Sequence, residues 1–325
     1  MDIVDVGHGS CVVVVTSDGV TVLDTGNRAS LLSYLEREDI ARVDRVLISH
    51  ADQDHIGGLI SMLDGGVEIG DIWLNPDASK RSAIWSALAY SLDDRQRRGG
   101  LLNVKDLGEG DAFDLGDEIS ATVLAPRLRL SLVGAGGRDR ENRSISSNSL
   151  SGVVMLSLRG QPEVLVPGDL DWAGWQHLKA SGVPLATRHL VLPHHGGSGG
   201  SPAQTAELLR ELSAASQANF VYVSNGREGG YGNPRALNVN TVASTLPGSR
   251  WACTQLAVAC APNTPQGARA DLLPITAKGR PTGSCCAGTI RLELVESELR
   301  RSGGAAHRSF IANAVPTPMC ASLNR

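Results

Sequence analysis

Two histidines and two aspartates fall within the six positions 50–55, inside the segment "SHADQDHIGG". They are His50, Asp52, Asp54 and His55. Imidazole nitrogens and carboxylate oxygens are ligands of divalent cations, and a carboxylate can bridge two metal ions. Without a cation, four such groups at the partly buried end of a strand would repel and desolvate one another. The segment therefore indicates a metal site.

Two later segments that resemble strands end in similar residues. "EVLVPG" is followed by Asp169, and "HLVLP" is followed by His194 and His195. Strand ends at one edge of a sheet are where α/β proteins gather their functional groups. Asp169 by itself could instead cap the helix expected near Trp172. Read one at a time, the remaining histidines are interpreted as ordinary surface or hydrogen-bonded residues: His8, His177, His189 and His307.

The elements that must position these groups alternate along the chain. Apolar runs predict strands at 2–6, 11–17, 20–26, 45–49, 71–75, 118–126, 150–160, 162–169, 188–197, 219–226 and 287–296. Helical spacing predicts helices at 28–39, 55–64, 82–94, 172–181 and 238–247. Residues 134–149 are rich in Gly, Arg and Ser and predict an exposed loop. This order predicts an α/β protein with two mixed β-sheets flanked by helices. No linker or internal repeat divides it, so we expect one domain over 1–297 and an extension over 298–325 that packs on it.

The composition narrows the class of protein. The chain has 325 residues, 42% hydrophobic and 20% charged, which is typical of a globular protein. No apolar run reaches the length of a membrane span, and the first residues lack a secretory-signal pattern, so we expect a cytoplasmic protein without membrane contact. The net charge of -4 gives no global attraction to nucleic acid. Aromatic residues make up 4%, too few for a surface that stacks single-stranded bases.

Taken together and in order, the motifs resemble the metallo-β-lactamase superfamily, and more narrowly the free-standing relatives of the hydrolase domain of the ComEC competence proteins. The opening "DVGHGSCVVV" and "DGVTVLDTG" resemble that branch's first hairpin, and "SHADQDHIGG" matches its HxDxDH signature. Similar segments follow over roughly residues 1–295: "SSNSLSGVVMLSL", "LVPGDLD", "LVLPHHGGSGG" and "VYVSNGREGGYGNP". The chain carries no counterpart of the competence proteins' transmembrane channel, so DNA uptake is excluded.

The resemblance implies an αβ/βα four-layer sandwich with two divalent metal ions at the sheet edge. His50 and Asp52 would bind one ion, Asp54 and His55 the other, and Asp169 would bridge them. Either His194 or His195 would complete the second site, and Asp54 would also orient the attacking water. Asn148 lies where other branches have a ligand histidine, and Asn233 replaces the His of a closing Tyr-Gly-His-Pro segment, so both are candidate catalytic residues. Asp52 in place of the superfamily's usual His adds a hard oxygen and shifts the preference from Zn²⁺ toward Mn²⁺.

The substrate groups that most need such a centre are phosphates, since two metals can hold both ends of an in-line displacement at phosphorus. Arginines in the Gly-rich loop could clamp phosphates along a strand, or the loop could simply be solvated. The candidate substrate-binding residues are Arg138, Arg140, Arg143, Ser149 and Tyr231. We therefore expect a phosphodiesterase or nuclease acting on DNA or RNA. The alternatives are a hydrolase of small phosphoesters such as phosphorylcholine, and a partner-binding regulatory module with a degraded site.

Five of the six cysteines lie in the last quarter of the chain. A structural Zn²⁺ could be held by Cys253, Cys260, either Cys285 or Cys286, and Cys320. The spacing of the first two is looser than that of a zinc knuckle, so buried small hydrophobic residues or disulfides are the competing interpretation.

Overall fold

Eight strands form the first of two mixed sheets. The computed structural model describes residues 1–75, 82–99, 103–227, 230–265, 278–279, 281–295 and 298–320. Across the first sheet the order is β15 (Glu298–Arg301), β14 (Ile290–Val295), β1 (Asp2–Ile3), β2 (Val12–Thr16), β3 (Gly19–Leu23), β4 (Arg42–Ile48), β5 (Glu68–Leu74) and β6 (Asn103–Asp106). The strands from β3 to β6 are parallel, and the others pair antiparallel.

Seven strands form the second sheet. Their order is β13 (Arg250–Cys253), β12 (Phe220–Val223), β11 (His189–Val191), β10 (Gln161–Val166), β9 (Val153–Leu158), β8 (Ile119–Ala125) and β7 (Ala112–Gly116). The strands from β10 to β13 are parallel, whereas β7 to β10 are joined antiparallel. Each sheet thus has a parallel part whose carboxyl ends can gather side chains at one edge.

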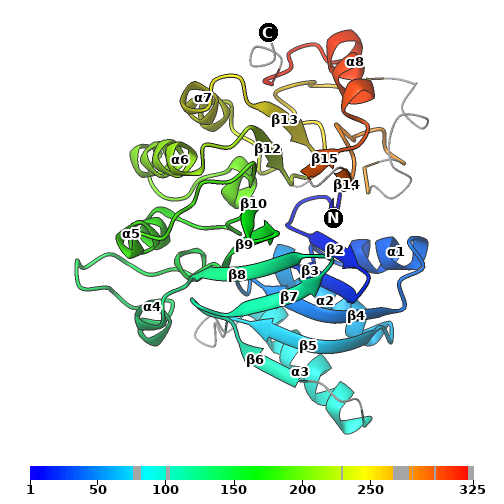
Figure 1. Ribbon diagram of the computed structural model, residues 1–325, viewed down its shortest axis with the longest axis vertical. Coiled ribbons are helices and arrows are strands. Elements are labelled where there is room, and N and C mark those ends of the chain that lie inside the picture. Colours follow the sequence, from blue (N-terminus) through cyan, green and yellow to red (C-terminus); the bar gives the residue numbers. More distant parts are fainter. Residues whose placement is uncertain are drawn as a thin grey trace.

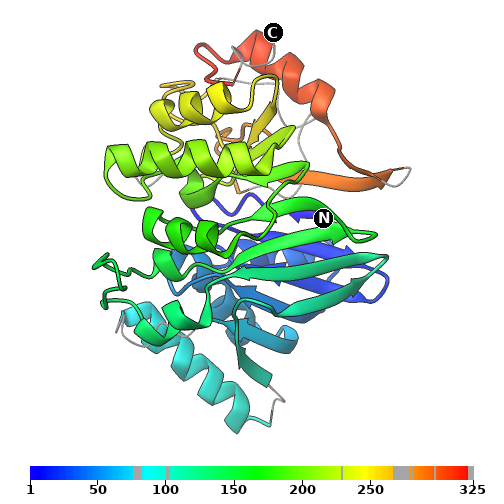
Figure 2. The ribbon, with the colours of Figure 1, turned by 60° about the vertical axis from the view of Figure 1, so that its left-hand side comes forward.

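Helices cover the outer face of each sheet. The first sheet carries α1 (Ser30–Arg37), α2 (Gln53–Asp64) and α3 (Ala83–Arg97), and the second carries α5 (Trp172–Ser181), α6 (Pro202–Ser216) and α7 (Ala236–Thr245). Figure 1 shows α5, α6 and α7 along one side of the molecule, and Figure 2 brings that side forward. The short helix α4 (Leu128–Val133) and two 3₁₀ turns, Asn148–Leu150 and Pro193–Gly196, lie between strands.

Alternation along the strands separates three apolar layers. Leu47 of β4 points toward the second sheet, while Val46 and Ile48 pack with the helices on the outer face. β2 divides in the same way, with Val12 inward and Val13 outward. Because a strand's side chains alternate between faces, both sheets are buried on both sides, and the predicted four-layer αβ/βα sandwich is confirmed.

The segment after residue 297 packs on both sheets. Its first part is β15, which pairs with β14, and its second part is α8 (Gly304–Ala314). Phe310 and Ile311 of α8 join the apolar cluster that also contains Trp251 of β13. Residues 321–325 of the expected extension lie outside the described part of the chain.

Several elements were not predicted from the sequence: α4, α6, α8, β6, β7, β13 and β15. The signals for α6 were present, because Ser201 and Gln204 form a capping box and Pro202 occupies the first turn. None of the helices among the described residues combines the length and apolarity needed to cross a bilayer.

Candidate metal centre

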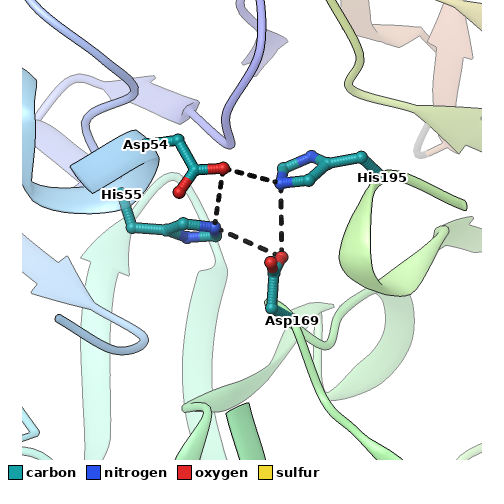
Figure 3. Close-up of side chains that lie close together, drawn as sticks. All are labelled: Asp54, His55, Asp169 and His195. Carbon is teal, nitrogen blue, oxygen red and sulfur yellow. Dashed lines mark ion pairs between the residues drawn. The ribbon is translucent and has the colours of Figure 1, made fainter. Parts of the chain in front are cut away.

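Three strand ends bring four side chains to one point between the sheets. β4 is followed by Asp54 and His55 in the first turn of α2, β10 is followed by Asp169, and β11 is followed by His195. One nitrogen or oxygen atom from each lies within 4.8 Å of the corresponding atoms of the others. Figure 3 shows the four side chains pointing toward one another. Asp54 and His55 thus come from the first sheet, and Asp169 and His195 come from the second.

The distances between these side chains are short enough for them to bind one cation together. His195 Nε2 lies 3.3 Å from Asp54 Oδ2 and 3.4 Å from Asp169 Oδ1. His55 Nε2 lies 3.2 Å from Asp169 Oδ1 and 4.0 Å from Asp54 Oδ2. His55, Asp169 and His195 are buried, and the Asp54 side chain is 18% exposed. The cluster is therefore largely closed to bulk water but open on one side.

The inner atoms of the cluster fit a divalent cation. His55 Nε2, His195 Nε2 and Asp169 Oδ1 are all buried and make no hydrogen bond of acceptable geometry. The opposite nitrogen of each histidine has a partner that can only accept: His55 Nδ1 donates to Asp24 Oδ2 at 2.8 Å, and His195 Nδ1 donates to the carbonyl oxygen of Ser224 at 2.8 Å. Nδ1 of each histidine therefore keeps its proton, and Nε2 is the atom that faces the cluster, as in an imidazole that binds metal.

Asp24 positions His55 and was not identified as a site residue from the sequence. It follows β3, is 2% exposed, and accepts hydrogen bonds from the backbone N–H and the Oγ of Ser49, at 2.7 and 2.8 Å. These bonds hold its second oxygen against His55. The sequence signal was its place in "LDTG" near the end of the strand predicted over 20–26, as the other site residues lie at or after the ends of apolar runs.

Gly58 lets α2 approach the loop after β3. A Cβ atom at this position would lie 2.0 Å from the carbonyl oxygen of Thr25. The Thr25 hydroxyl donates to the His55 carbonyl at 2.6 Å and accepts from the Leu59 N–H at 2.9 Å. The second glycine of "HIGG" is thus required by the close contact that fixes the first turn of α2.

A second group of donors lies beside the first. His50 Nε2 is buried without a hydrogen-bond partner and lies 3.8 Å from Asp52 Oδ2. Because the Ser49 hydroxyl donates to Asp24, its oxygen accepts from His50 Nδ1 at 3.0 Å, so Nε2 of His50 carries the lone pair. Asp52 is the N-cap residue of α2, yet its side chain makes no capping hydrogen bond. His50 and Asp52 are thus oriented for an ion adjacent to the four-residue cluster.

His194 and His195 have different surroundings. Both lie in the left-handed backbone region, with φ of 52° and 55°. Such backbone conformations are costly for residues other than glycine and cluster at functional sites. His195 is buried in the cluster, whereas His194 is 27% exposed, with Nδ1 3.7 Å from Asp169 Oδ2 and 3.2 Å from Asn148 Nδ2.

Asp171, not Asp169, caps α5, accepting from the N–H of Gly174 at 2.9 Å.

The charges in the cluster oppose the effect of burial. Burial alone would raise the pKa of Asp169, but His195 and His55 lower it well below its usual range. Burial would likewise lower the pKa of His55, but Asp169 and Asp24 raise it well above its ordinary value. In His50, burial and the neighbouring His55 together lower the pKa to about 4. The carboxylates are therefore ionised and His50 is neutral at neutral pH, whereas His55 stays protonated until a bound cation displaces its proton.

His8 lies at the rim of the cluster, where the sequence suggested an ordinary histidine. Its Nε2 is 3.3 Å from Asp54 Oδ2, and burial lowers its pKa to about 4. The ring stacks on Tyr231 with centroids 3.9 Å apart, and Tyr231 is 60% exposed. His8 and Tyr231 thus form one wall of the open side.

Three further candidate residues, Ser149, Asn233 and Asn148, differ in what their side chains contact. Ser149 is buried, and its hydroxyl donates to Asp171 Oδ2 at 2.7 Å, which is a structural contact. Asn233 is 8% exposed and lies against Gly197. Asn148 contacts only His194 among the site histidines. Of these three, Asn148 is the one placed at the site.

The loop arginines are engaged elsewhere. Arg143 pairs with Asp139 and, at 2.8 Å, with Glu141, while Arg138 donates to the carbonyl oxygen of Asn142 at 2.8 Å. Arg140 is exposed and lines a groove with Asp139 and Glu141. None of the three arginines makes an ion pair or hydrogen bond with the four-residue cluster. The phosphate clamp expected of them is not formed in this arrangement.

Four of the five cysteines proposed for a structural zinc site lie in one apolar cluster: Cys253, Cys260, Cys286 and Cys320. No disulfide joins the five candidate cysteines, which all lie in described parts of the chain, and no three of their sulfur atoms lie within 4.8 Å of one another. Cys285 donates to Asp5 Oδ2, and Cys286 contacts His307 Nε2 at 3.2 Å. Burial raises the pKa of Cys253 well above its ordinary value, so the thiol stays protonated. The structural zinc site thus stays a prediction.

Comparison with known proteins gives one family match. The model of the Metallo-beta-lactamase superfamily matches residues 4–65, the part of the chain that contains "SHADQDHIGG". A search of curated protein sequences gave no match.

Several solved structures of low sequence identity align with large parts of this chain. Tm1679, described as a metal-dependent hydrolase of the beta-lactamase superfamily, is 16% identical over 78% of this chain and 94% of that chain, with a TM-score of 0.47. Unliganded yeast PDE1 is 13% identical over 75% and 92%, with a TM-score of 0.47. The short form of human tRNase Z is 12% identical over 70% and 93%, with a TM-score of 0.40.

The two mixed sheets flanked by helices are the metallo-beta-lactamase fold, and the cluster at their shared edge is a candidate metal site of histidines and aspartates. Together with the match over residues 4–65, these findings support placing the chain in the metallo-beta-lactamase superfamily.

Proposed function

We propose that this chain is a metal-dependent phosphodiesterase of the ComEC-like branch that cleaves nucleic acid with two divalent ions, Zn²⁺ or Mn²⁺, in the cytoplasm. The observation that carries the proposal is the convergence of buried nitrogen and oxygen atoms of His55, Asp169 and His195 beside Asp54, none of which makes a hydrogen bond of acceptable geometry. A purely structural role would give these buried atoms well-formed hydrogen bonds, since buried polar groups without them are costly.

The residues divide into two sets. Asp54, His55, Asp169 and His195 would hold one ion, and His50 and Asp52 would hold the other, with Asp169 between them. Divalent cations at such a site act as Lewis acids toward water and phosphoryl oxygen. Asp52, which stands where the superfamily usually has His, adds a carboxylate oxygen and favours Mn²⁺ relative to Zn²⁺.

Asp54 would orient the attacking water. Nearby His55 and His195 lower the pKa of the Asp54 carboxyl against the effect of burial, so it remains an acceptor at neutral pH. Its Oδ2 lies between His195 and His8, at the boundary of the buried cluster and the open side. A water that donates a hydrogen bond to this carboxylate would face a substrate entering past His8 and Tyr231.

A second candidate function is the hydrolysis of small phosphoesters. It is favoured by the engagement of Arg138 and Arg143 within their own loop, because a nucleic-acid strand would need cations along its path. The two candidates share the chemistry at the metal site and differ in the length of substrate.

The test is a panel of substrates on metal-stripped protein supplied with Mn²⁺ or Zn²⁺. Single- and double-stranded DNA, RNA, bis(p-nitrophenyl) phosphate and p-nitrophenyl phosphorylcholine would be compared. The nuclease proposal expects DNA or RNA cleavage that Asp54→Ala combined with His55→Ala abolishes and that His177→Ala, outside the site, retains. Activity that survives the double substitution would refute the assigned site. Turnover of the small esters alone would replace the nuclease proposal with the second candidate.

A further inference from the structure

A cavity of about 870 Å³ lies between α8 and the second sheet, away from the metal centre. Its lining includes Phe220 and Arg250, which begin β12 and β13, and Arg188, which precedes β11. The metal centre lies at the carboxyl ends of parallel strands, so this cavity is at the opposite edge of the sheet. Figure 1 shows α8 and β15 next to β12 and β13 at that end of the molecule.

The cavity is strongly basic. Five arginines line it, against a single carboxylate, that of Glu298: Arg188, Arg250, Arg300, Arg301 and Arg308. Glu298 pairs with Arg188 at 3.0 Å and with Arg300 at 3.5 Å. Within the described part of the chain, Arg250, Arg301 and Arg308 form no ion pair. Among the described residues, the cavity thus holds an excess of positive charge over negative charge.

Arg301 is the most constrained of these cations. Its Nη1 donates to His307 Nδ1 at 3.3 Å, and its Nε is buried with no hydrogen-bond partner among the described residues. Burial lowers the pKa of its guanidinium, which is the effect of removing a cation from water without supplying an anion. A buried charge that lacks its partner destabilises a fold, so an anion in the cavity would relieve this cost.

The cavity also offers apolar and aromatic surface. Arg188 and Arg250 lie over the Phe220 ring, each 5.9 Å from its centroid. Ile311 and Val315, from α8 and the residue after it, face the same space. The volume falls within the range typical of small-molecule sites.

We propose that this cavity binds a small phosphorylated ligand of about mononucleotide size, with its phosphate on Arg301 and Arg308 and its ring system near Phe220. Guanidinium groups bind phosphate oxygens in pairs, and they stack on flat rings as they do on Phe220 here. The site is separate from the proposed hydrolase centre and does not depend on it.

Calorimetric titration of metal-free protein with AMP, inorganic phosphate and adenosine tests the proposal. AMP is expected to bind more tightly than either fragment and to raise the Tm. Arg301→Met should weaken AMP binding by about tenfold or more, the effect of losing a hydrogen bond to a charged group. The same substitution should raise the Tm of the ligand-free protein, because it removes a partly buried cation that has no ion pair among the described residues. Arg140→Met, an exposed arginine in another groove, is the matched control and should change neither.

Arg308→Glu serves as a second variant, because this exposed residue can change without affecting folding. It should also weaken AMP binding, whereas Asp54→Ala with His55→Ala should leave it unchanged, which separates this site from the metal centre. The proposal is overturned if AMP and phosphate give no heat and no Tm shift at millimolar concentration. It is also overturned if Arg301→Met and Arg308→Glu bind AMP as the wild type does, or if only an oligonucleotide binds.

Discussion

Asp24→Asn tests whether the second nitrogen of His55 sets its metal-binding form. Asparagine has the same shape and tolerates the left-handed backbone of residue 24, where φ is 54°. Its amide oxygen can still accept from the Ser49 N–H, but its NH₂ group then faces His55 Nδ1. His55 Nδ1 must become an acceptor, which moves the ring proton to Nε2 and points it at the cluster.

The expected cost follows from the bond that is lost. His55 Nδ1 and Asp24 Oδ2 are 2.8 Å apart in residues that are 0% and 2% exposed, a geometry in which solvent screens little. A hydrogen bond to a charged group contributes about 1.5–3 kcal/mol, and each 1.4 kcal/mol corresponds to about a tenfold change in affinity. We therefore expect metal affinity to fall by about 10- to 100-fold.

Metal affinity would be measured by competition with a chromophoric chelator at fixed pH. The matched control is Asp44→Asn, which removes a carboxylate that accepts from the Val20 N–H at 2.9 Å at the opposite end of the same sheet. Its affinity should equal that of the wild type. An Asp24→Asn protein that folds and binds metal as tightly as the wild type would refute the assignment of Asp24 and of the His55 tautomer.

Further predictions concern other histidines. His195→Ala should weaken metal binding by about tenfold or more in the chelator assay, and His194→Ala should weaken it less, because only His195 has its Nε2 in the four-residue cluster; equal losses would contradict this. His8→Gln should leave metal affinity unchanged and raise KM, since His8 lies at the rim; a lost metal ion would place His8 among the ligands. Burial, with a smaller effect from Arg188, lowers the pKa of His189 from 6.5 to about 4. The unfolded chain takes up this proton near pH 6.5 and the folded chain does not. Stability should therefore fall by up to about 3 kcal/mol as the pH drops from 6.5 to 4, and denaturant titrations should show a weaker fall in His189→Gln.

The strand-end pattern made much of the site predictable. Asp54, His55 and Asp169 each follow an apolar run, and the parallel parts of the sheets bring such ends together. Which of two adjacent histidines enters the cluster was not predictable, because the left-handed backbone at His194 and His195 turns their side chains apart. That choice depends on the turn, and composition and periodicity do not encode it.

Contacts between distant segments explain the remaining differences. Arg143 pairs with Asp139 in its own loop, which sequence alone could not show. The fold also places His8 beside Asp54, although the two are far apart in the sequence. The distances between the cysteines likewise depend on how β13, the segment before β14 and the end of the chain pack together. Sequence spacing does not reveal this packing. Residue types indicated the chemistry, whereas the tertiary structure decided which members take part.

The most direct test of the metal centre is an anomalous difference map from crystals of the protein grown or soaked with Mn²⁺. We expect a peak bounded by Asp54, His55, Asp169 and His195, with a second peak beside His50 and Asp52. A map without density between these four side chains, in protein shown to bind Mn²⁺ in solution, would contradict it.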